Sequence, residues 1–212
     1  MVSAKRLAIM GGTFDPIHFG HLLIAEQARE AMELDMVVFV PNGRPVFEKP
    51  HEVTSAEERF RLCSLAIAGN SRFSLSRAEI DRPGPSFAVD TVQEFRKLYP
   101  NLDALFFITG ADAVLDILGW HEYDRLIDQC EFIAATRPGF KLDRLNELGS
   151  ETLRGRIHFL TIPGLDISST DIRARVTRGH SIRYLTPDPV VRRIDEVGLY
   201  RPDCSSSDNA AV

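Results

Sequence analysis

The chain has 212 residues, of which 44% are hydrophobic, and a formal net charge of −5 at pH 7. That content suffices for one well-buried α/β core, and the acidic balance argues against an extended nucleic-acid surface, which needs a basic stripe, while leaving open a small pocket for an anionic ligand. The three cysteines, Cys63, Cys130 and Cys204, contain no C-x-x-C pair, so we expect reduced thiols and neither a disulfide framework nor a structural metal.

The first residues give no sign of a targeting or membrane sequence. The stretch "MVSAKRLAIM" lacks a long apolar region with a small-residue cleavage site, and no run of the chain approaches the roughly 20 apolar residues that span a bilayer. We therefore expect a soluble, cytoplasmic protein without a membrane partner.

Short apolar runs predict buried strands along most of the chain. They are residues 6–10, 36–40, 72–76, 104–110, 131–137 and 157–162. Helical patterns separate most of these runs, and such alternation favours a parallel sheet covered by helices on both sides. The expected fold class is therefore α/β, with a doubly wound parallel sheet in a single domain.

The segment "MGGTFDPIHFGH", residues 10–21, follows the first run and precedes a helical pattern. Gly11 and Gly12 carry no Cβ, which predicts a tight turn and a close approach of the backbone to a ligand. His18 and His21 share a face at the start of the helix, and Gly20 between them lets a ligand approach the first turn. We expect the two histidines to face one anion together.

Other interpretations of this segment stay open. One histidine can cap the helix while the other packs in the core. A hydrolytic metal site is disfavoured, because H-x-x-H supplies two ligands and no general-base glutamate lies between them. Asp15 before Pro16 is typical of a turn.

Two amphipathic helices are predicted next. Apolar residues recur at three- and four-residue steps from Leu22 to Leu34, with charged residues on the other face. A second helix begins after Ser55, whose hydroxyl can cap it while Glu58 completes an S-x-x-E capping box.

Ligands of open α/β sheets lie beyond the carboxyl ends of the strands, and the unusual residues of this chain fall there. "PNGRPVFEKP" (41–50) follows the second run, "GAD" (110–112) closes and follows the fourth, and "ISSTDIR" (167–173) comes after the last. We therefore expect the functional residues in these loops.

The last of these segments predicts the start of a helix at Ser168, Ser169 and Thr170. Free backbone N–H groups, hydroxyl donors and the positive end of the helix dipole favour phosphate there, and Arg173 adds a planar cation. The alternative is an ordinary N-cap with Asp171 in the first turn.

The end of the chain, "DCSSSDNAAV" (203–212), is polar and has no apolar periodicity. Such a segment cannot offset its ordering entropy, so we expect it to be disordered and the folded domain to cover residues 1–202.

Together, "GGTFDPIHFGH" and "ISSTDIR" resemble the two signatures of the nucleotidyltransferases that carry an H-x-G-H motif, which are Rossmann-like α/β enzymes. "GAD", Trp120, "TRPG" (136–139) and the pair Asp90–Thr91 are similar to the bacterial nicotinate-nucleotide adenylyltransferases. The resemblance covers essentially residues 6–200.

This resemblance implies transfer of the adenylyl group of ATP to nicotinic acid mononucleotide (NaMN), with release of pyrophosphate and with Mg²⁺ as cofactor. It implies direct in-line attack without a covalent intermediate, so that positioning and charge neutralisation carry the catalysis. His18, His21 and Arg173 are the implied catalytic residues. The implied partners are the two small-molecule substrates and no nucleic acid, and a homo-oligomer is left open.

The resemblance also assigns the two substrate sites. The implied ATP-binding residues are Gly11, Gly12, Thr13, Phe14, His18, His21, Gly110, Asp112, Ile167, Ser168, Ser169, Thr170 and Arg173. The implied pyridine-nucleotide residues are Asp15, Asn42, Arg44, Lys49, Ser86, Phe87, Ala88, Asp112, Trp120, His121 and Arg137. Trp120 would stack on the pyridine ring, although on residue type alone a core anchor is nearly as good an interpretation.

Two departures from the family pattern affect these assignments. The basic residue that usually follows the proline-rich loop is displaced to Lys49, so either Arg44 or Lys49 can meet phosphate. The usual S-Y-T is Ser86-Phe87-Ala88, which removes a hydroxyl near the pyridine carboxylate and leaves backbone amides to bind it.

Two other functions stay open. The first is nucleotidyl transfer to another phosphate ester, such as phosphopantetheine or glycerol phosphate, which shares the two signatures but does not explain "GAD" followed by Trp120. The second is a nucleotide-binding module without turnover.

Overall fold

The computed structural model describes residues 5–46, 51–136, 153 and 155–202. Within these ranges the strands form one parallel sheet in the order β3-β2-β1-β4-β5-β6. The strands are β1 (Arg6–Gly12), β2 (Met36–Pro41), β3 (Phe73–Leu75), β4 (Ala104–Gly110), β5 (Glu131–Thr136) and β6 (Ile157–Thr161). Each predicted strand is confirmed within these ranges, whereas the predictions for Lys49, Arg137 and residues 203–212 lie outside the described residues.

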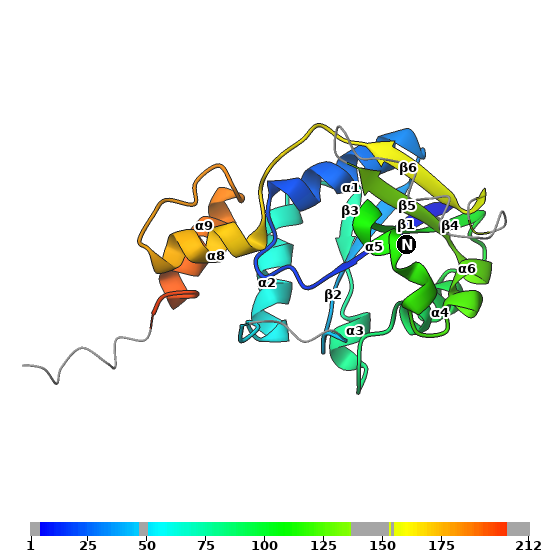
Figure 1. Cartoon of the computed structure of the whole chain (residues 1–212), viewed down its shortest axis with the longest axis horizontal. Coiled ribbons are helices and arrows are strands. Elements are labelled where there is room, and N and C mark those ends of the chain that lie inside the picture. Colours follow the sequence, from blue (N-terminus) through cyan, green and yellow to red (C-terminus); the bar gives the residue numbers. More distant parts are fainter. Residues whose placement is uncertain (1–4, 47–50, 137–152, 154, 203–212) are drawn as a thin grey trace, which may run out of the picture.

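Helices cover both faces of this sheet (Figure 1). They are α1 (Phe19–Ala31), α2 (Ala56–Ile67), α3 (Ala78–Asp81), α4 (Ala88–Leu98), α5 (Ala111–Leu115), the 3-10 helix η1 (Ile117–Gly119), α6 (Tyr123–Gln129), α8 (Ser169–Thr177) and α9 (Asp188–Val197). The doubly wound, Rossmann-like α/β fold expected from the sequence is therefore confirmed.

Successive residues of the strands supply two separate cores. Leu7 and Ile9 of β1 face α4 and α6, in a cluster that includes Phe95 and Leu126. Ala8 and Met10 face α1, α2, α8 and α9. Because both faces of a parallel sheet are buried in this way, its strands read as continuous apolar runs, which is why they could be recognised in the sequence.

The centre of the sheet lies between β1 and β4. From β1 the chain proceeds through β2 to β3 on one side, and from β4 it proceeds through β5 to β6 on the other. The order of the strands therefore reverses at β1 and β4, and the crevice beyond their carboxyl ends is where proteins of this architecture bind ligands.

The predicted turn at Gly11 and Gly12 is wrong. Both residues belong to β1 and pair with Val40 and Pro41 of β2. The chain turns instead at Asp15 and Pro16, as the alternative interpretation of this pair expected, directly after Phe14, whose φ of 50° is left-handed. The glycines are needed for close approach, because a Cβ on Gly12 would lie 2.9 Å from the Phe14 ring.

Helix starts follow the sequence signals closely. α1 begins at Phe19, three residues before the first apolar residue of the predicted pattern. Ser55 caps α2, and its hydroxyl accepts the Glu58 N–H at 3.3 Å. The other half of the predicted capping box is wrong, because the Glu58 carboxylate does not accept the Ser55 N–H and pairs instead with Arg193 of α9 at 2.6 and 2.8 Å. None of the helices that the structure describes is long and apolar enough to cross a membrane.

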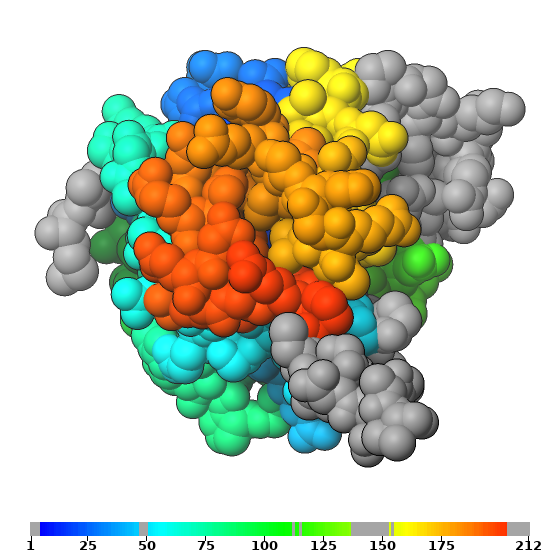
Figure 2. Space-filling view, turned by 90° about the vertical axis from the view of Figure 1, so that its left-hand side faces the viewer, coloured from blue at the N-terminus to red at the C-terminus, as the bar shows by residue number. Residues whose placement is uncertain are grey.

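The elements α8 and α9 form a layer against α1 and α2, and they cover the middle of the face seen in Figure 2. α9 is strongly amphipathic, with Val190 and Ile194 fully buried. It ends at Gly198, where φ is 68°, a left-handed conformation typical of the residue after a helix. This layer is thus part of the core.

We predict that Ile194→Ala lowers the free energy of unfolding by about 2–5 kcal/mol, because it removes buried methyl groups and leaves a cavity. Urea denaturation followed by circular dichroism measures the change. Glu196→Ala, two positions further along the same helix and exposed, is the control and should change stability by less than about 0.5 kcal/mol. Equal stability of the two variants would show that α9 does not contribute to the core.

Candidate active site: two cavities at the carboxyl edge of the sheet

Two cavities open at the carboxyl ends of β1 and β4 and share Gly11 and Thr109. The tryptophan cavity, of about 440 Å³, is lined by Gly11, Gly12, Thr13, Asn42, Pro45, Val46, Glu79, Ser86, Phe87, Ala88, Phe107, Thr109, Gly119, Trp120 and His121. The histidine-pair cavity, of about 370 Å³, is lined by Met10, Gly11, His18, Gly20, His21, Leu23, Ile24, Ile108, Thr109, Gly110, Ile162, Pro163, Leu165, Ile167, Ser168 and Ser169. Gly11 and Thr109 therefore form a partition at which the two cavities adjoin.

The motif loop, residues 13–17 between β1 and α1, is held by its backbone carbonyl groups. Four of these carbonyls each accept a hydrogen bond from a side chain of a distant part of the chain. The donors are Arg59 to Thr13 O (2.7 Å), Arg173 to Asp15 O (2.7 Å), Ser169 to Pro16 O (2.9 Å) and Thr186 to Ile17 O (2.8 Å). The loop conformation thus depends on α2, on α8 and on the segment that precedes α9.

The two histidines stand together at the start of α1. Their rings stack with centroids 3.7 Å apart, and His21 Nδ1 accepts the backbone N–H of His18 at 3.2 Å. Since a backbone N–H only donates, His21 Nδ1 is unprotonated and the neutral ring carries its proton on Nε2. The open alternative of a capping histidine is therefore correct for His21, and both side chains still line the same cavity.

Burial keeps both imidazoles neutral in the free protein. It lowers the pKa of His18 to about 4, and burial together with the neighbouring His18 lowers the pKa of His21 well below its usual value. His18 Nδ1 is a buried atom without a hydrogen-bond partner in the described part of the chain. The pair can thus act as neutral N–H donors towards an anion.

The start of α8 faces the same cavity. Ser168 is its N-cap, and the hydroxyl accepts the Asp171 N–H at 3.1 Å, so the ordinary cap considered as an alternative is present. Ile167, Ser168 and Ser169 line the cavity beside the histidines. Arg173 does not line it, because the guanidinium reaches Asp15 O and lies 3.3 Å from the Thr170 hydroxyl.

The other residues assigned to ATP by resemblance are divided between the two cavities and the core beneath them. Gly12 and Thr13 line the tryptophan cavity, and Gly110 lines the histidine-pair cavity. Phe14 is buried beneath the site, with its ring edge-on to His21 at 5.1 Å. The side chain of Asp112 lies outside the described structure.

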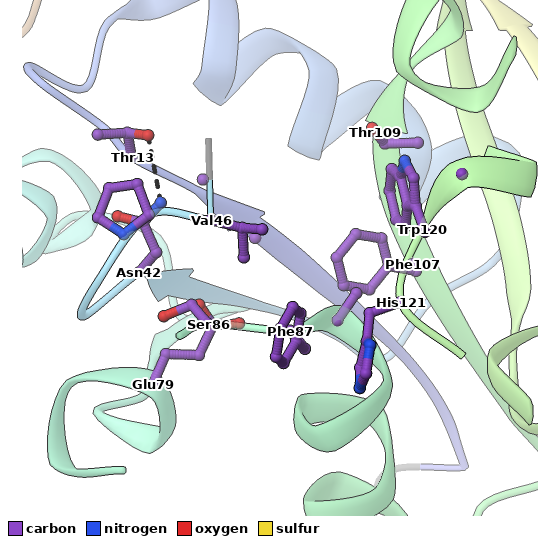
Figure 3. A pocket seen from close by; sticks show the side chains of 15 residues that line it. Thr13, Asn42, Val46, Glu79, Ser86, Phe87, Phe107, Thr109, Trp120 and His121 are labelled. Carbon is purple, nitrogen blue, oxygen red and sulfur yellow. Dashed lines mark hydrogen bonds between the residues drawn. The ribbon is translucent and has the colours of Figure 1, made fainter. Parts of the chain in front are cut away.

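Most of the described residues assigned to the pyridine nucleotide come together in the tryptophan cavity (Figure 3). They are Asn42, Ser86, Phe87, Ala88, Trp120 and His121. Asp15 and Arg44 do not join them: Asp15 is buried and accepts the Tyr200 hydroxyl at 2.7 Å, and Arg44 is exposed. The carboxylate of Asp15 is thus hydrogen-bonded within the protein and does not line the tryptophan cavity.

Aromatic rings form one end of the tryptophan cavity. Trp120 contacts Phe107 and Phe132 edge-on, with centroids 6.0 and 6.3 Å apart, and Phe87 stacks on His121 at 4.1 Å. Trp120 is therefore a core anchor, one of the two interpretations of this residue, and it also lines the cavity, while its stacking on a pyridine ring stays a prediction.

Two buried charged residues beside the tryptophan cavity were missed by the sequence reasoning. Arg59 is only 1% exposed and Glu79 5%. Arg59 lies on the apolar face of α2, three positions before Leu62 and four before Cys63. A single arginine among apolar residues on such a face indicates a buried, hydrogen-bonded guanidinium, and this signal could have been used. Glu79 lines the tryptophan cavity, accepts the Thr91 hydroxyl at 2.7 Å, and has a pKa raised by burial. No local pattern marks it.

Gly43 is also required by packing. A Cβ at this position would lie 2.1 Å from the Glu79 carbonyl oxygen, closer than any side chain tolerates. Its N–H donates to the Ser86 hydroxyl at 3.1 Å. This contact joins the loop after β2 to the start of α4.

Comparison with known proteins identifies a matching family and similar enzymes. Residues 9–175 match the family described as cytidylyltransferase-like. The chain is 54% identical over 200 residues to a probable nicotinate-nucleotide adenylyltransferase of Moorella thermoacetica, covering 93% of this chain and 92% of that protein. It is 44% identical over 208 residues to one of Saccharopolyspora erythraea, covering 98% and 95%.

Solved structures show the same fold. The Plasmodium falciparum nicotinic acid mononucleotide adenylyltransferase complexed with NaAD has a TM-score of 0.76 and 22% identity, with 92% of this chain and 97% of that chain covered. The same enzyme complexed with APC gives a TM-score of 0.74. At this level of identity the likeness concerns the arrangement of strands and helices.

We predict that the free energy of unfolding falls as the pH is lowered from about 6.5 towards 4, because the unfolded histidine takes up a proton near 6.5 and the folded His18 only near 4. One such group contributes at most about 1.4 kcal/mol per pH unit. Urea denaturation at several pH values measures the slope. The slope should be smaller in His18→Gln than in the wild type, and an equal slope in the two proteins would contradict the lowered pKa of His18.

Proposed function

Because the chain belongs to the nicotinate-nucleotide adenylyltransferases, within the cytidylyltransferase-like family, we propose that it transfers the adenylyl group of ATP to NaMN. The products are nicotinic acid adenine dinucleotide and pyrophosphate, and the reaction is a step of NAD biosynthesis. The observation that carries the proposal is the pair of cavities that meet at Gly11 and Thr109. One holds paired histidines and a helix start, the other an aromatic wall, so each suits one of the two substrates.

ATP fits the histidine-pair cavity. Its polyphosphate would meet the neutral imidazole N–H groups of His18 and His21 and the positive end of α8, with Arg173 close behind. The adenine ring would lie against apolar side chains of the same cavity, such as Leu23 and Ile167. Uncharged donors suit a site where negative charge grows in the transition state, because they need no proton at the moment of reaction.

The chemistry needs no nucleophile from the protein. The phosphate of NaMN attacks the α-phosphorus of ATP, and the bond from that phosphorus to the bridging oxygen of pyrophosphate breaks. The protein holds the two phosphates in line and in direct contact where the cavities adjoin, beside the partition, and stabilises the charge on the leaving group. The glycine backbone of the partition allows them to come close.

NaMN fits the tryptophan cavity. Trp120 offers a face for the pyridinium ring. The carboxylate would be bound by the first N–H groups of α4, which begins at Ala88 and has no side-chain cap among the described residues. These backbone donors can replace the hydroxyl that this chain lacks at Ala88, and they favour a carboxylate over a neutral amide.

Mg²⁺ fits this site as an ion carried by ATP. Among the described residues, no three side chains of His, Cys, Asp or Glu gather where they could hold a metal ion. The buried carboxylate of Asp15 is occupied by Tyr200. Mg²⁺ prefers phosphate oxygens and water, with few protein ligands, and bound to ATP it would neutralise charge on the polyphosphate.

We predict that the purified protein releases pyrophosphate from ATP and Mg²⁺ with NaMN, more slowly with the nicotinamide form, and not with phosphopantetheine. His18→Ala should lower kcat by roughly 10²-fold, as when a preorganised donor is removed. His180→Ala, which lies outside both cavities, is the control. Turnover of phosphopantetheine alone would replace the proposed substrate, and nucleotide binding without turnover would indicate a regulatory module.

For Trp120 we predict an effect on one substrate only. Trp120→Leu keeps apolar contact with Phe107 but removes the stacking face, so KM for NaMN should rise by roughly 5- to 10-fold, corresponding to about 1 kcal/mol, while KM for ATP stays unchanged. Trp120→Phe should retain part of the affinity. Steady-state kinetics decide the point, and a higher KM for ATP alone would assign the indole to the other substrate.

A further inference from the structure

Arg59 is a buried guanidinium that joins the two loops at one end of the tryptophan cavity. Its Nη1 donates to Thr13 O at 2.7 Å and to Asn42 Oδ1 at 3.0 Å, and its Nη2 donates to Asn42 O at 2.7 Å. Its Nε donates to Thr54 O at 2.8 Å. Burial lowers its pKa, while the negative charges of Asp15 and Glu79 oppose that shift, and an arginine keeps its proton under such conditions.

This arrangement fixes the orientation of the Asn42 amide. A guanidinium has only donors, so the amide atom that faces it must be the oxygen. The amide nitrogen then points the other way and donates to the Thr13 hydroxyl oxygen at 3.2 Å. Because that oxygen already accepts this hydrogen bond, the hydroxyl proton is directed elsewhere.

The Asn42 amide and the Thr13 hydroxyl, whose hydrogen-bond directions are fixed in this way, lie at the end of the cavity opposite the indole of Trp120. Figure 3 shows Thr13 and Asn42, joined by their hydrogen bond, across the cavity from Trp120. Thr13 follows Gly11 and Gly12, and Gly11 belongs to the partition between the cavities. A mononucleotide whose ring lies at Trp120 therefore extends its phosphate towards Thr13.

We infer that Arg59 is a positioning residue, which sets the direction of the Arg59–Asn42–Thr13 hydrogen bonds so that the Thr13 hydroxyl donates to the attacking phosphate. This rests on the proposed function and deepens it. A phosphate dianion is a pure acceptor, so it is bound well only if every polar group facing it donates. Without the fixed guanidinium, the amide could turn and present its oxygen to Thr13, whose proton would then point away from the phosphate.

The test compares two ligands that differ only by the phosphate, NaMN and nicotinic acid riboside. Binding of each is measured by isothermal titration calorimetry, with the unreactive α,β-methylene analogue of ATP present. In Thr13→Val, which keeps the side-chain shape, the affinity for NaMN should fall by roughly 10- to 100-fold, as for a lost hydrogen bond to a charged group, and the affinity for the riboside should change by less than about twofold. Thr13→Ser, which keeps the hydroxyl, should bind both ligands as the wild type does.

Arg59→Lys tests the positioning role itself. Lysine keeps the charge but lacks the planar fork that contacts both loops at once. The inference expects a loss of affinity for NaMN larger than the loss for the riboside, whereas a purely structural role would weaken both equally.

The outcomes separate the two proposals. If the wild type neither binds NaMN nor turns it over, the proposed function fails. If the wild type binds NaMN and Thr13→Val binds it equally well, or loses both ligands equally, the inference about Arg59 and Thr13 is overturned while the proposed function stands. Should Arg59→Lys fail to fold, Asn42→Asp tests the same hydrogen bonds: its carboxylate cannot donate to the Thr13 hydroxyl, so affinity for NaMN should fall more than affinity for the riboside, and equal losses overturn the inference.

Discussion

The site depends on how the motif loop is held by its own carbonyl groups. Residues 13–17 lie between a strand and a helix and belong to neither, so their buried carbonyls need partners from elsewhere. Arg59, Arg173, Ser169 and Thr186 supply them. An unpaired buried carbonyl costs about 1–3 kcal/mol, so the loop adopts this shape only when α2 and α8 are in place. The carboxyl-terminal third of the chain thus both lines the histidine-pair cavity and holds the motif loop in place.

The same contacts explain why one loop serves two cavities. The loop follows β1 after Gly12, turns at Asp15 and Pro16 and leads to α1, which begins at Phe19. Its first residue, Thr13, lines the tryptophan cavity, and His18, directly after its end, lines the other. Holding the intervening carbonyls fixes the separation of these two side chains. A reaction that joins two phosphates across the partition needs that separation to be constant.

Much of this could be predicted from the sequence, and the exceptions have a common cause. Strands were recognisable because both of their faces are buried, and the general position of the site followed from the carboxyl-edge rule. The hydrogen bonds of Arg59 to Thr13 and of Arg173 to Asp15 span 46 and 158 positions in the sequence, and no local pattern encodes such partners. For the same reason Asp15 was assigned to a substrate, although its carboxylate is held by Tyr200. The turn was wrongly placed at Gly11 and Gly12, because these glycines make room for aromatic rings and do not bend the chain. Gly12 packs against the ring of Phe14, and Gly11 packs against the ring of Phe107, which lies far away in the sequence.

The shared wall of the two cavities also bears on how a ligand leaves. A molecule that extends past Gly11 and Thr109 would occupy both cavities. It would lose its translational freedom only once, so binding of one half raises the effective concentration of the other half at its own cavity. A dinucleotide bound in both cavities would therefore have a longer residence time than either mononucleotide, since releasing one half leaves the other tethered. The geometry that brings two phosphates together also makes departure of the joined molecule a step that can limit turnover.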